Sequence, residues 1–323
     1  MPTEVSGRPL ASLSLDVDDL WSYLKTHGDA EWERRPSYLD RFIPRALAVF
    51  DRLGAKCTFF LVGVDAARHG GDGLLRSLVQ SGHQVGNHSF EHEPWLHLYG
   101  DAELDTEIRR AEEAIEAATG RKPRGFRGPG FSWSPRLFEV LASRGYAFDA
   151  STLPTWLGPL ARQYYFWTAR LTREERERRR ALFGSFKDGM RPVKPYRWTM
   201  DGGQTLLEIP VTTIPILRTP FHLSYLIYLS RWSEGLMNAY LATALAACRM
   251  GGVEPSFLLH PLDLMGGDEV PALAFFPGMD LTGARKTQLF EWAIRAIGRH
   301  FELVDLDTHA DSLRERTLPT FNV

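Results

Sequence analysis

Three acidic residues follow an apolar, strand-like run near the start of the chain, in the stretch SLSLDVDDLW over residues 12–21. In an extended strand successive side chains point to opposite faces, so Asp16 and Asp18 face the same side. Two neighbouring carboxylates resist joint ionisation unless a positive group lies beside them, which makes a metal ion or an arginine their natural partner. The sequence therefore predicts a bound cation or a buried arginine at this corner.

Two histidines lie four residues apart, His88 and His92, in the stretch GNHSFEHEPW. On a helical turn this spacing would bring both imidazoles to one face. Ser89 stands where the HExxH motif of zinc proteases needs a glutamate, so that motif is excluded. Together with one carboxylate from DVDD, the histidines form a two-histidine, one-carboxylate ligand set. Such a set leaves coordination positions open, which is more typical of catalytic than of structural metal sites.

The same ligand set also serves non-haem iron oxygenases, so other polar residues must decide the reaction. FRGPGFSW supplies Arg127, whose guanidinium keeps its proton and could hold the second aspartate ionised. YAFDAST supplies Asp149, and FLLHPLD supplies His260. A metal with an added base and an added acid indicates hydrolysis, in which water attacks a carbonyl and a positioned group protonates the leaving nitrogen.

Short apolar or aromatic runs alternate with amphipathic segments and would position these residues. Strands alternating with helices imply βαβ units and a parallel sheet, and seven or eight such runs predict an α/β barrel. Reactive side chains of such barrels lie at the carboxyl ends of the strands. The predicted strand ends carry Asp16, Asp18, His88, Arg127, Asp149 and His260. The strand-like runs are ASLSLDVD, AKCTFFLVG, GHQVGNH, RGFRGPG, YAFDAST, TLLEIPVT, SFLLHP and FELVDL. The predicted helices cover residues 44–53, 72–81, 101–119, 134–144 and 284–299, with Pro44 at a first helical position and Gly54 past the end.

We expect a single domain over residues 1–323 with two departures from the strand–helix rhythm. Residues 153–204 have weak strand patterning and a charge run, TREERERRRAL, and are predicted to form an insertion that caps or flanks the barrel mouth. Residues 214–250 form an apolar helical segment, in which Ser233 caps a helix that runs to Gly251. Its run 214–232 fits core packing, contact with a membrane or lipid-linked substrate, or a dimer interface, so peripheral membrane contact and an oligomer both stay open.

Composition limits the partners and the compartment. A net charge of −2 and a pI near 6.6 give no electrostatic footprint for nucleic acid. Cys57 and Cys248 have no metal-type spacing and are expected to be free thiols in a reducing compartment. The sequence shows neither a signal-peptide pattern nor an apolar run of bilayer length. The expected location is therefore cytoplasmic, including the periphery of the inner membrane face.

The ordered set LDVDD, HSFEH, RGPG, FDAST and LLHP resembles the five motifs of the polysaccharide deacetylases of carbohydrate esterase family 4. The resemblance covers about residues 11–310 outside the insertion. It implies a distorted, partly open (β/α)7-8 barrel with an inserted cap segment, and removal of an acetyl group from an N-acetylated sugar. It also implies a divalent metal, most commonly zinc, with cobalt, nickel, manganese and iron as alternatives.

The resemblance assigns a role to each motif residue. His88 and His92 become metal ligands, Arg127 steadies the base, and His260 becomes the general acid tuned by Asp149.

The first motif departs from the common family form, in which glycine follows two adjacent aspartates, because leucine follows Asp19 here. Its D-x-D spacing resembles the branch of the aminoarabinose-lipid deformylases. We therefore expect Asp16 to be the base and Asp18 the metal ligand. In the common alignment, Asp18 would be the base and Asp19 the ligand.

The expected function is metal-dependent N-deacetylation of an amino sugar in a glycan or a polyprenyl-linked glycan precursor. A deformylase or a cyclic-amide hydrolase on the same scaffold is the alternative enzyme, because one methyl group in a pocket is worth only about 1–3 kcal/mol. A glycan-binding or metal-binding scaffold without catalysis is the alternative from another class. Trp21, Tyr23 and Trp32, which follow the first motif, either stack on sugar rings or pack against the barrel rim.

Overall fold

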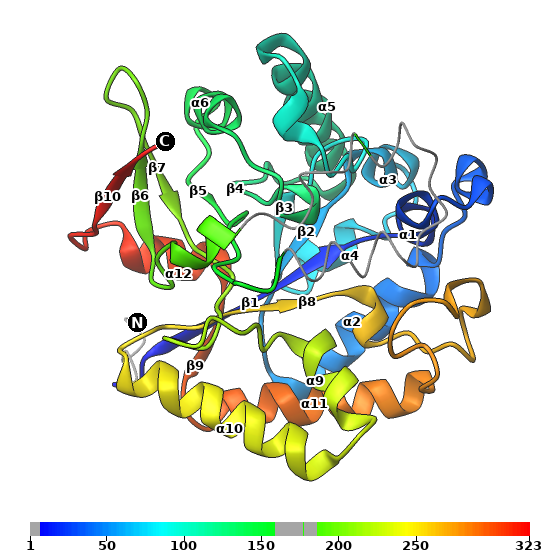
Figure 1. The fold of residues 1–323 in the computed structure, drawn as a ribbon. Coiled ribbons are helices and arrows are strands. Elements are labelled where there is room, and N and C mark those ends of the chain that lie inside the picture. The colour runs from blue at the N-terminus through cyan, green and yellow to red at the C-terminus, as the bar shows by residue number, and fades with distance from the viewer. Residues whose placement is uncertain (1–6, 159–176, 178–185) are drawn as a thin grey trace.

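One large, mostly parallel sheet organises the chain (Figure 1). The computed structural model describes residues 7–158, 177 and 186–323. Within them the strand order is β10-β6-β7-β5-β4-β3-β2-β1-β8, and β9 pairs with β1. Among the described residues, β6 and β7 are the only antiparallel pair of strands in this sheet. The strands are β1 (Leu10–Val17), β2 (Thr58–Leu61), β3 (Gln84–Asn87), β4 (Gly125–Phe126), β5 (Phe148–Asp149), β6 (Tyr196–Thr199), β7 (Thr205–Glu208), β8 (Ser256–Leu259), β9 (Glu302–Asp305) and β10 (Thr320–Asn322).

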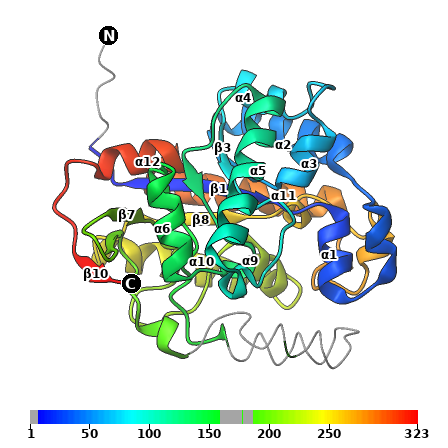
Figure 2. The ribbon, with the colours of Figure 1, turned by 90° about the horizontal axis from the view of Figure 1, so that it is seen from above.

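Helices cover the sheet on both sides, with α9, α10 and α11 together on one side and α5 and α6 on the other (Figure 1). Both views place α1 at one end of the molecule and the β6, β7 and β10 group at the other (Figure 2). The helices of at least five residues are α1 (Leu20–His27), α2 (Leu39–Leu53), α3 (Gly63–Arg68), α4 (Arg76–Gln80), α5 (Asp101–Thr119), α6 (Pro135–Ser143), α9 (Leu223–Ser230), α10 (Glu234–Met250), α11 (Gly283–Gly298) and α12 (Leu306–Leu313). No helix in the described ranges is both long and apolar enough to span a membrane.

The strand β1 is buried from Ala11 to Val17 and forms the centre of the sheet. It pairs with β9 through residues 10–13, with β2 through residues 14–17 and with β8 through residues 12–15. Contacts on both edges and both faces explain its high apolar content. These pairings also fix the position of Asp16 and Asp18 at the carboxyl end of β1.

The barrel is nearly closed at a seam between β7 and β8. Residues 209–212, just past β7, continue beside β5, where the Ile209 N–H donates to the Asp149 carbonyl at 2.9 Å. Three residues later the Thr212 N–H donates to the Ser256 carbonyl at 3.0 Å, and the Ser256 N–H donates to Thr212 Oγ1 at 2.7 Å. The expected distorted, partly open α/β barrel is therefore confirmed, with two hydrogen bonds in place of a strand ladder at the seam.

The bounds of predicted helices differ in places, and the helix predicted over 72–81 is shorter, since α4 covers only Arg76–Gln80. The helix predicted to begin at Pro44 begins at Leu39, because burial of Leu39, Phe42 and Ile43 outweighs the hydrogen bond lost at an internal proline. Gly54 ends it as predicted, in a left-handed conformation with φ of 60°.

The predicted insertion also differs from the structure. Residues 159–176 and 178–185 of it lie outside the described residues. Its last part forms β6 and the turn that leads to β7, so it belongs to the sheet. The alternation of buried Tyr196 and Trp198 with less buried neighbours is the strand signal for β6.

We predict that Thr212→Val destabilises the fold by about 1–3 kcal/mol, because the isosteric valine leaves the buried Ser256 N–H without its acceptor. The measurement is chemical denaturation. Thr243→Val, at an exposed position of α10 where the hydroxyl bonds its own helix, is the matched control and should change stability much less. Equal stability of the two variants would show that the seam does not depend on this bond.

Candidate active site

The polar residues singled out from the sequence gather at the carboxyl ends of the strands. Asp16 and Asp18 lie at the end of β1, and His88 directly follows β3. Arg127 follows β4, Asp149 ends β5 and His260 follows β8. Parallel strands bring these ends to one rim of the barrel, where a shared site can form.

Asp18, His88 and His92 offer three donor atoms that lie within 4.8 Å of one another. Both imidazole Nε2 atoms approach Asp18 Oδ1, at 2.9 Å from His92 and 3.4 Å from His88. The Asp18 Oδ1 atom is nevertheless buried without a hydrogen bond in the described structure. Three donors that converge without satisfying one another fit a shared cation, and one carboxylate with two imidazoles suits a divalent transition metal.

Electrostatics within this cluster point the same way. Burial raises the pKa of Asp18, but the neighbouring His92 and His88 outweigh it and hold that pKa well below its usual range. Burial lowers the pKa of His88, but Asp16 and Asp18 outweigh it, and the net shift is upward. The cluster therefore favours a positive charge beside the carboxylates of Asp16 and Asp18.

The two histidines meet through a left-handed turn and not through the predicted helical turn. Ser89 and His92 have positive φ values of 63° and 52°. The turn is held by side chains, because Asn87 Oδ1 accepts the Ser89 N–H at 2.8 Å and Ser89 Oγ accepts the His92 N–H at 3.1 Å. These local bonds compete with helix formation, which explains the failure of the spacing argument.

Glu107 on α5 also holds this turn, and the sequence analysis missed it. Its buried Oε1 accepts the N–H groups of Phe90, at 2.9 Å, and Glu91, at 2.8 Å. Burial raises the pKa of Glu107, although both N–H donors favour its charged form. A glutamate between Leu104 and Ile108, on the apolar stripe of a predicted helix, was the available signal.

Arg127 is fully buried and joins several segments of the site. Its Nη1 donates to Asp16 Oδ1 at 2.7 Å, its Nη2 to Ser14 Oγ at 3.0 Å and its Nε to the Ala150 carbonyl at 3.0 Å. The guanidinium also lies 4.4 Å from the centre of the Phe60 ring. The arginine predicted beside the aspartate pair is therefore present, and it contacts Asp16.

The backbone of Arg127 links this ion pair to the donor cluster. His88 Nδ1 lies 2.6 Å from the Arg127 carbonyl, which can only accept a hydrogen bond, so Nδ1 carries the proton. His88 Nε2 is then left as a lone-pair donor, directed by a backbone bond of the kind that orients metal ligands. The same Nε2 lies 4.0 Å from Asp16 Oδ2, which places Asp16 beside the cluster.

Asp19, the alternative metal ligand, is occupied elsewhere. Its Oδ1 accepts the N–H groups of Leu20, at 2.7 Å, and Tyr38, at 2.9 Å, and it caps α1. Burial raises the pKa of its carboxyl group. The structure thus brings Asp18 and not Asp19 to the histidines.

Asp149 does not have the partner that the family resemblance implied. Its two oxygens accept the Ser151 N–H at 2.8 Å and the Ser151 hydroxyl at 2.7 Å, and Ser151 Oγ accepts the Gly128 N–H at 2.8 Å. Burial and the adjacent Glu208 raise the pKa of Asp149 well above its usual value. No hydrogen bond or ion pair joins Asp149 to His260 among the described residues. Asp149 supports the loop that carries Arg127.

His260 starts the short helix η5 (Pro261–Asp263), and its side chain points toward α9. Its Nδ1 lies 3.4 Å from Ser224 Oγ, a neighbour that the sequence gave no reason to expect.

Among the aromatic residues after the first motif, Trp21 packs inside the fold. It is fully buried, its indole N–H donates to Asp65 at 2.9 Å, and its ring meets that of His92 edge-on at 6.3 Å. Tyr23 packs edge-on against Phe276 at 5.3 Å. The packing alternative therefore describes Trp21, whose ring has no exposed face for a sugar.

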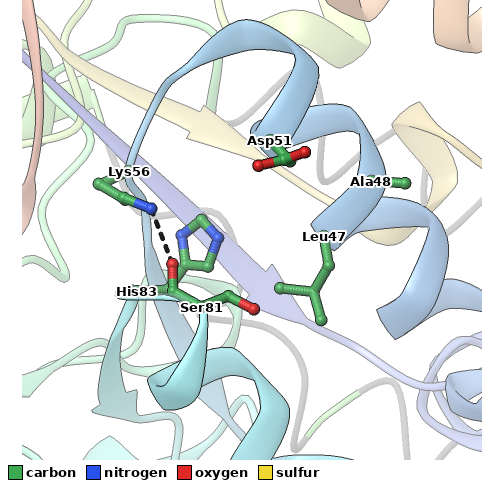
Figure 3. A pocket seen from close by; sticks show the side chains of 6 residues that line it. All are labelled: Leu47, Ala48, Asp51, Lys56, Ser81 and His83. Atoms are coloured by element: carbon green, nitrogen blue, oxygen red, sulfur yellow. Dashed lines mark hydrogen bonds between the residues drawn. The ribbon is translucent and has the colours of Figure 1, made fainter.

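A hollow of about 330 Å³ lies at the opposite ends of the strands, beside Lys56 and His83 (Figure 3). Lys56 Nζ donates to the Ser81 carbonyl at 2.7 Å, and the Cys57 N–H donates to His83 Nδ1 at 3.2 Å. Burial and Lys56 lower the pKa of His83 to about 4. These residues precede β2 and β3, so the hollow is not part of the site.

Comparison with known proteins agrees with this geometry. The profile of the family described as polysaccharide deacetylase matches residues 14–148, which run from within β1 to the first residue of β5 and include the donor cluster. This segment is similar to the polysaccharide deacetylase family. A Helicobacter pylori peptidoglycan deacetylase is 26% identical over 45% of this chain and 50% of its own length. A Bradyrhizobium chitooligosaccharide deacetylase is 32% identical over 32% of this chain and 47% of its own length.

The whole chain resembles a solved Mycobacterium smegmatis protein assigned to the polysaccharide deacetylases. The two structures superpose with a TM-score of 0.61 over 99% of this chain and 96% of that protein, at 18% identity. This likeness shows that the fold extends beyond the matched family segment. The chain spans about half the length, or less, of the curated deacetylases named above.

We predict that Glu107→Ala weakens Zn²⁺ binding about 10–100-fold, because the turn that carries both histidines loses its anchor. The measurement is competition of the protein with a chromogenic chelator for added Zn²⁺. Glu113→Ala on the exposed face of the same helix is the matched control and should bind as the parent does. Unchanged affinity in a folded Glu107→Ala protein would contradict the anchoring role.

Proposed function

We propose that this protein is a metal-dependent hydrolase that removes the N-acetyl group from an amino sugar of a glycan or lipid-linked glycan precursor. The observation that carries the proposal is the Asp16–Arg127 pair beside the converging donors of Asp18, His88 and His92. The names of the deacetylase relatives support the reaction class. Their partial coverage of this chain leaves the substrate itself to experiment.

The residues fit a divalent metal at the three-donor cluster, most commonly zinc for two imidazoles and one carboxylate. Such a metal would supply Lewis-acid polarisation of the acyl carbonyl and acidify a water molecule. Asp18, His88 and His92 would hold it. Three protein donors are characteristic of catalytic zinc sites, which keep a further position for water or substrate.

The side chains around the cluster account for the proton transfers of amide hydrolysis. Asp16, which Arg127 holds beside His88, would take a proton from the attacking water. His260, at the same rim, would give a proton to the departing amine as the carbon–nitrogen bond breaks. One proton is removed and one is delivered, which yields acetate and the free amino sugar.

An exposed apolar surface on the α9 side supports a lipid-linked substrate and peripheral contact with a membrane. Ile216 is 91% exposed and Trp232 is 76% exposed, which is unusual for such large apolar side chains. Ser224 approaches His260 from the same helix that carries exposed Tyr228. A lipid chain that contacts Tyr228 would therefore lie about one helical turn from Ser224, the neighbour of His260. The cytoplasmic location stays a prediction, as does the oligomeric state.

We predict chelator-sensitive release of acetate from N-acetylated amino sugars. The measurement quantifies acetate and formate from matched soluble and polyprenyl-linked substrates, before and after chelation and with Zn²⁺ added back. Preference for the polyprenyl-linked set would support a substrate role for the exposed α9 surface. Release of formate in place of acetate would identify the deformylase alternative.

The proposed general acid is tested with His260→Ala. This variant should lose turnover by about 10²–10⁴-fold while it keeps its bound metal. His300→Ala, an exposed histidine past α11, should keep the parent's activity. Loss of metal from His260→Ala would contradict its assignment as the acid. A metal-loaded parent that releases neither product from any substrate would favour the non-catalytic scaffold.

A further inference from the structure

His260 and Asp263 share one tight turn after β8. The His260 backbone N–H donates to Asp263 Oδ2 at 2.8 Å. Ser224 reaches the same carboxylate from α9, and its hydroxyl donates to Asp263 Oδ1 at 2.9 Å. The Ser224 oxygen also lies 3.4 Å from His260 Nδ1, and Asp263 is only 1% exposed. The three side chains thus form one hydrogen-bonded chain beside the rim.

Counting protons fixes the direction of this chain. A serine hydroxyl has one proton, and an ionised carboxylate can only accept, so beside ionised Asp263 the Ser224 proton is committed to Asp263. The Ser224 oxygen can then only accept from His260, which requires the proton of the neutral imidazole to sit on Nδ1. Nε2 is left as the nitrogen that gains and loses a proton.

Burial is the largest effect on Asp263 and leaves its pKa raised. His260, the two hydrogen-bond donors and the nearby Lys286 of α11 partly offset that rise and favour the ionised form. Lys286 Nζ itself donates to the Leu262 carbonyl at 2.7 Å. Asp263 also lies close enough to Tyr23 of α1 to contribute to the raised pKa of that phenol.

A second histidine beside His260 does not compete for the proton. The ring centres of His222 and His260 are 6.0 Å apart, and His222 packs edge-on against Tyr225 at 4.7 Å. Burial, His260 and Arg127 lower the pKa of His222 to about 3. His222 is therefore neutral at working pH, and the negative charge of Asp263 acts on His260.

We propose that Ser224 and Asp263 are the positioning residues of the general acid, in the role that the family resemblance implied for Asp149. Ser224 holds the His260 Nδ1 proton, Asp263 orients Ser224 and stabilises the imidazolium, and Nε2 delivers the proton to the departing amine. The acid step rests on the proposed function. The direction of the hydrogen-bonded chain does not.

The first test is histidine side-chain ¹⁵N NMR on the metal-loaded protein. The neutral His260 ring should carry its proton on Nδ1 in the parent and shift toward Nε2 in Ser224→Ala. Ser230→Ala, whose hydroxyl bonds the Ile227 carbonyl on the same helix, is the matched control and should leave the tautomer unchanged. A parent ring protonated on Nε2 would overturn the proposal.

The second test is the pH profile of turnover. Ser224→Ala should lower kcat about tenfold or more with little change in KM, a loss within the range of general acid catalysis. Asp263→Asn should also move the alkaline limb of the profile to lower pH, because the imidazolium loses its neighbouring negative charge. Parent-like kcat and pH profiles in both variants would overturn the proposal. An inactive parent would contradict the proposed function alone, since the NMR result still decides the hydrogen-bonded chain.

Discussion

The buried ion pair between Arg127 and Asp16 is the interaction on which the rest of the site depends. Two charges taken out of water cost several kcal/mol each, so such a pair persists only where the remaining donors and acceptors are satisfied. Here Ser14 and the Ala150 carbonyl accept two further guanidinium N–H groups, and Phe60 covers its face. These partners come from β1, β2 and the segment after β5, so the pair forms only when the barrel is assembled.

The same arginine connects Asp16 with the donor cluster. Its side chain holds the aspartate that would take a proton, and its carbonyl sets the tautomer of His88, one of the three converging donors. Behind it, Asp149 and Ser151 hold the Gly128 N–H and thereby the loop. The proposed base and one proposed metal ligand are thus held by one residue, which would keep their separation constant, as a preorganised site requires.

Much of this arrangement could be predicted from the linear sequence, because it depends on local periodicity. All eight strand-like runs contain strands, the helix predicted over 101–119 is found at those bounds, and the polar residues lie at the strand ends. The unpredicted parts depend on contacts between distant segments. Glu107 reaches the histidine turn from α5, and Ser224 reaches His260 from α9. The left-handed turn at His92 depends on side-chain bonds that a four-residue spacing cannot distinguish from a helix.

Within DVDD, we assign Asp16 as the base and Asp18 as the metal ligand, and one paired measurement tests this assignment most directly. Zinc content and acetate release are measured together for Asp16→Asn and Asp18→Asn. We predict that Asp16→Asn keeps one bound zinc and loses acetate release, whereas Asp18→Asn loses both. Loss of zinc from Asp16→Asn, with zinc retained by Asp18→Asn, would contradict the account.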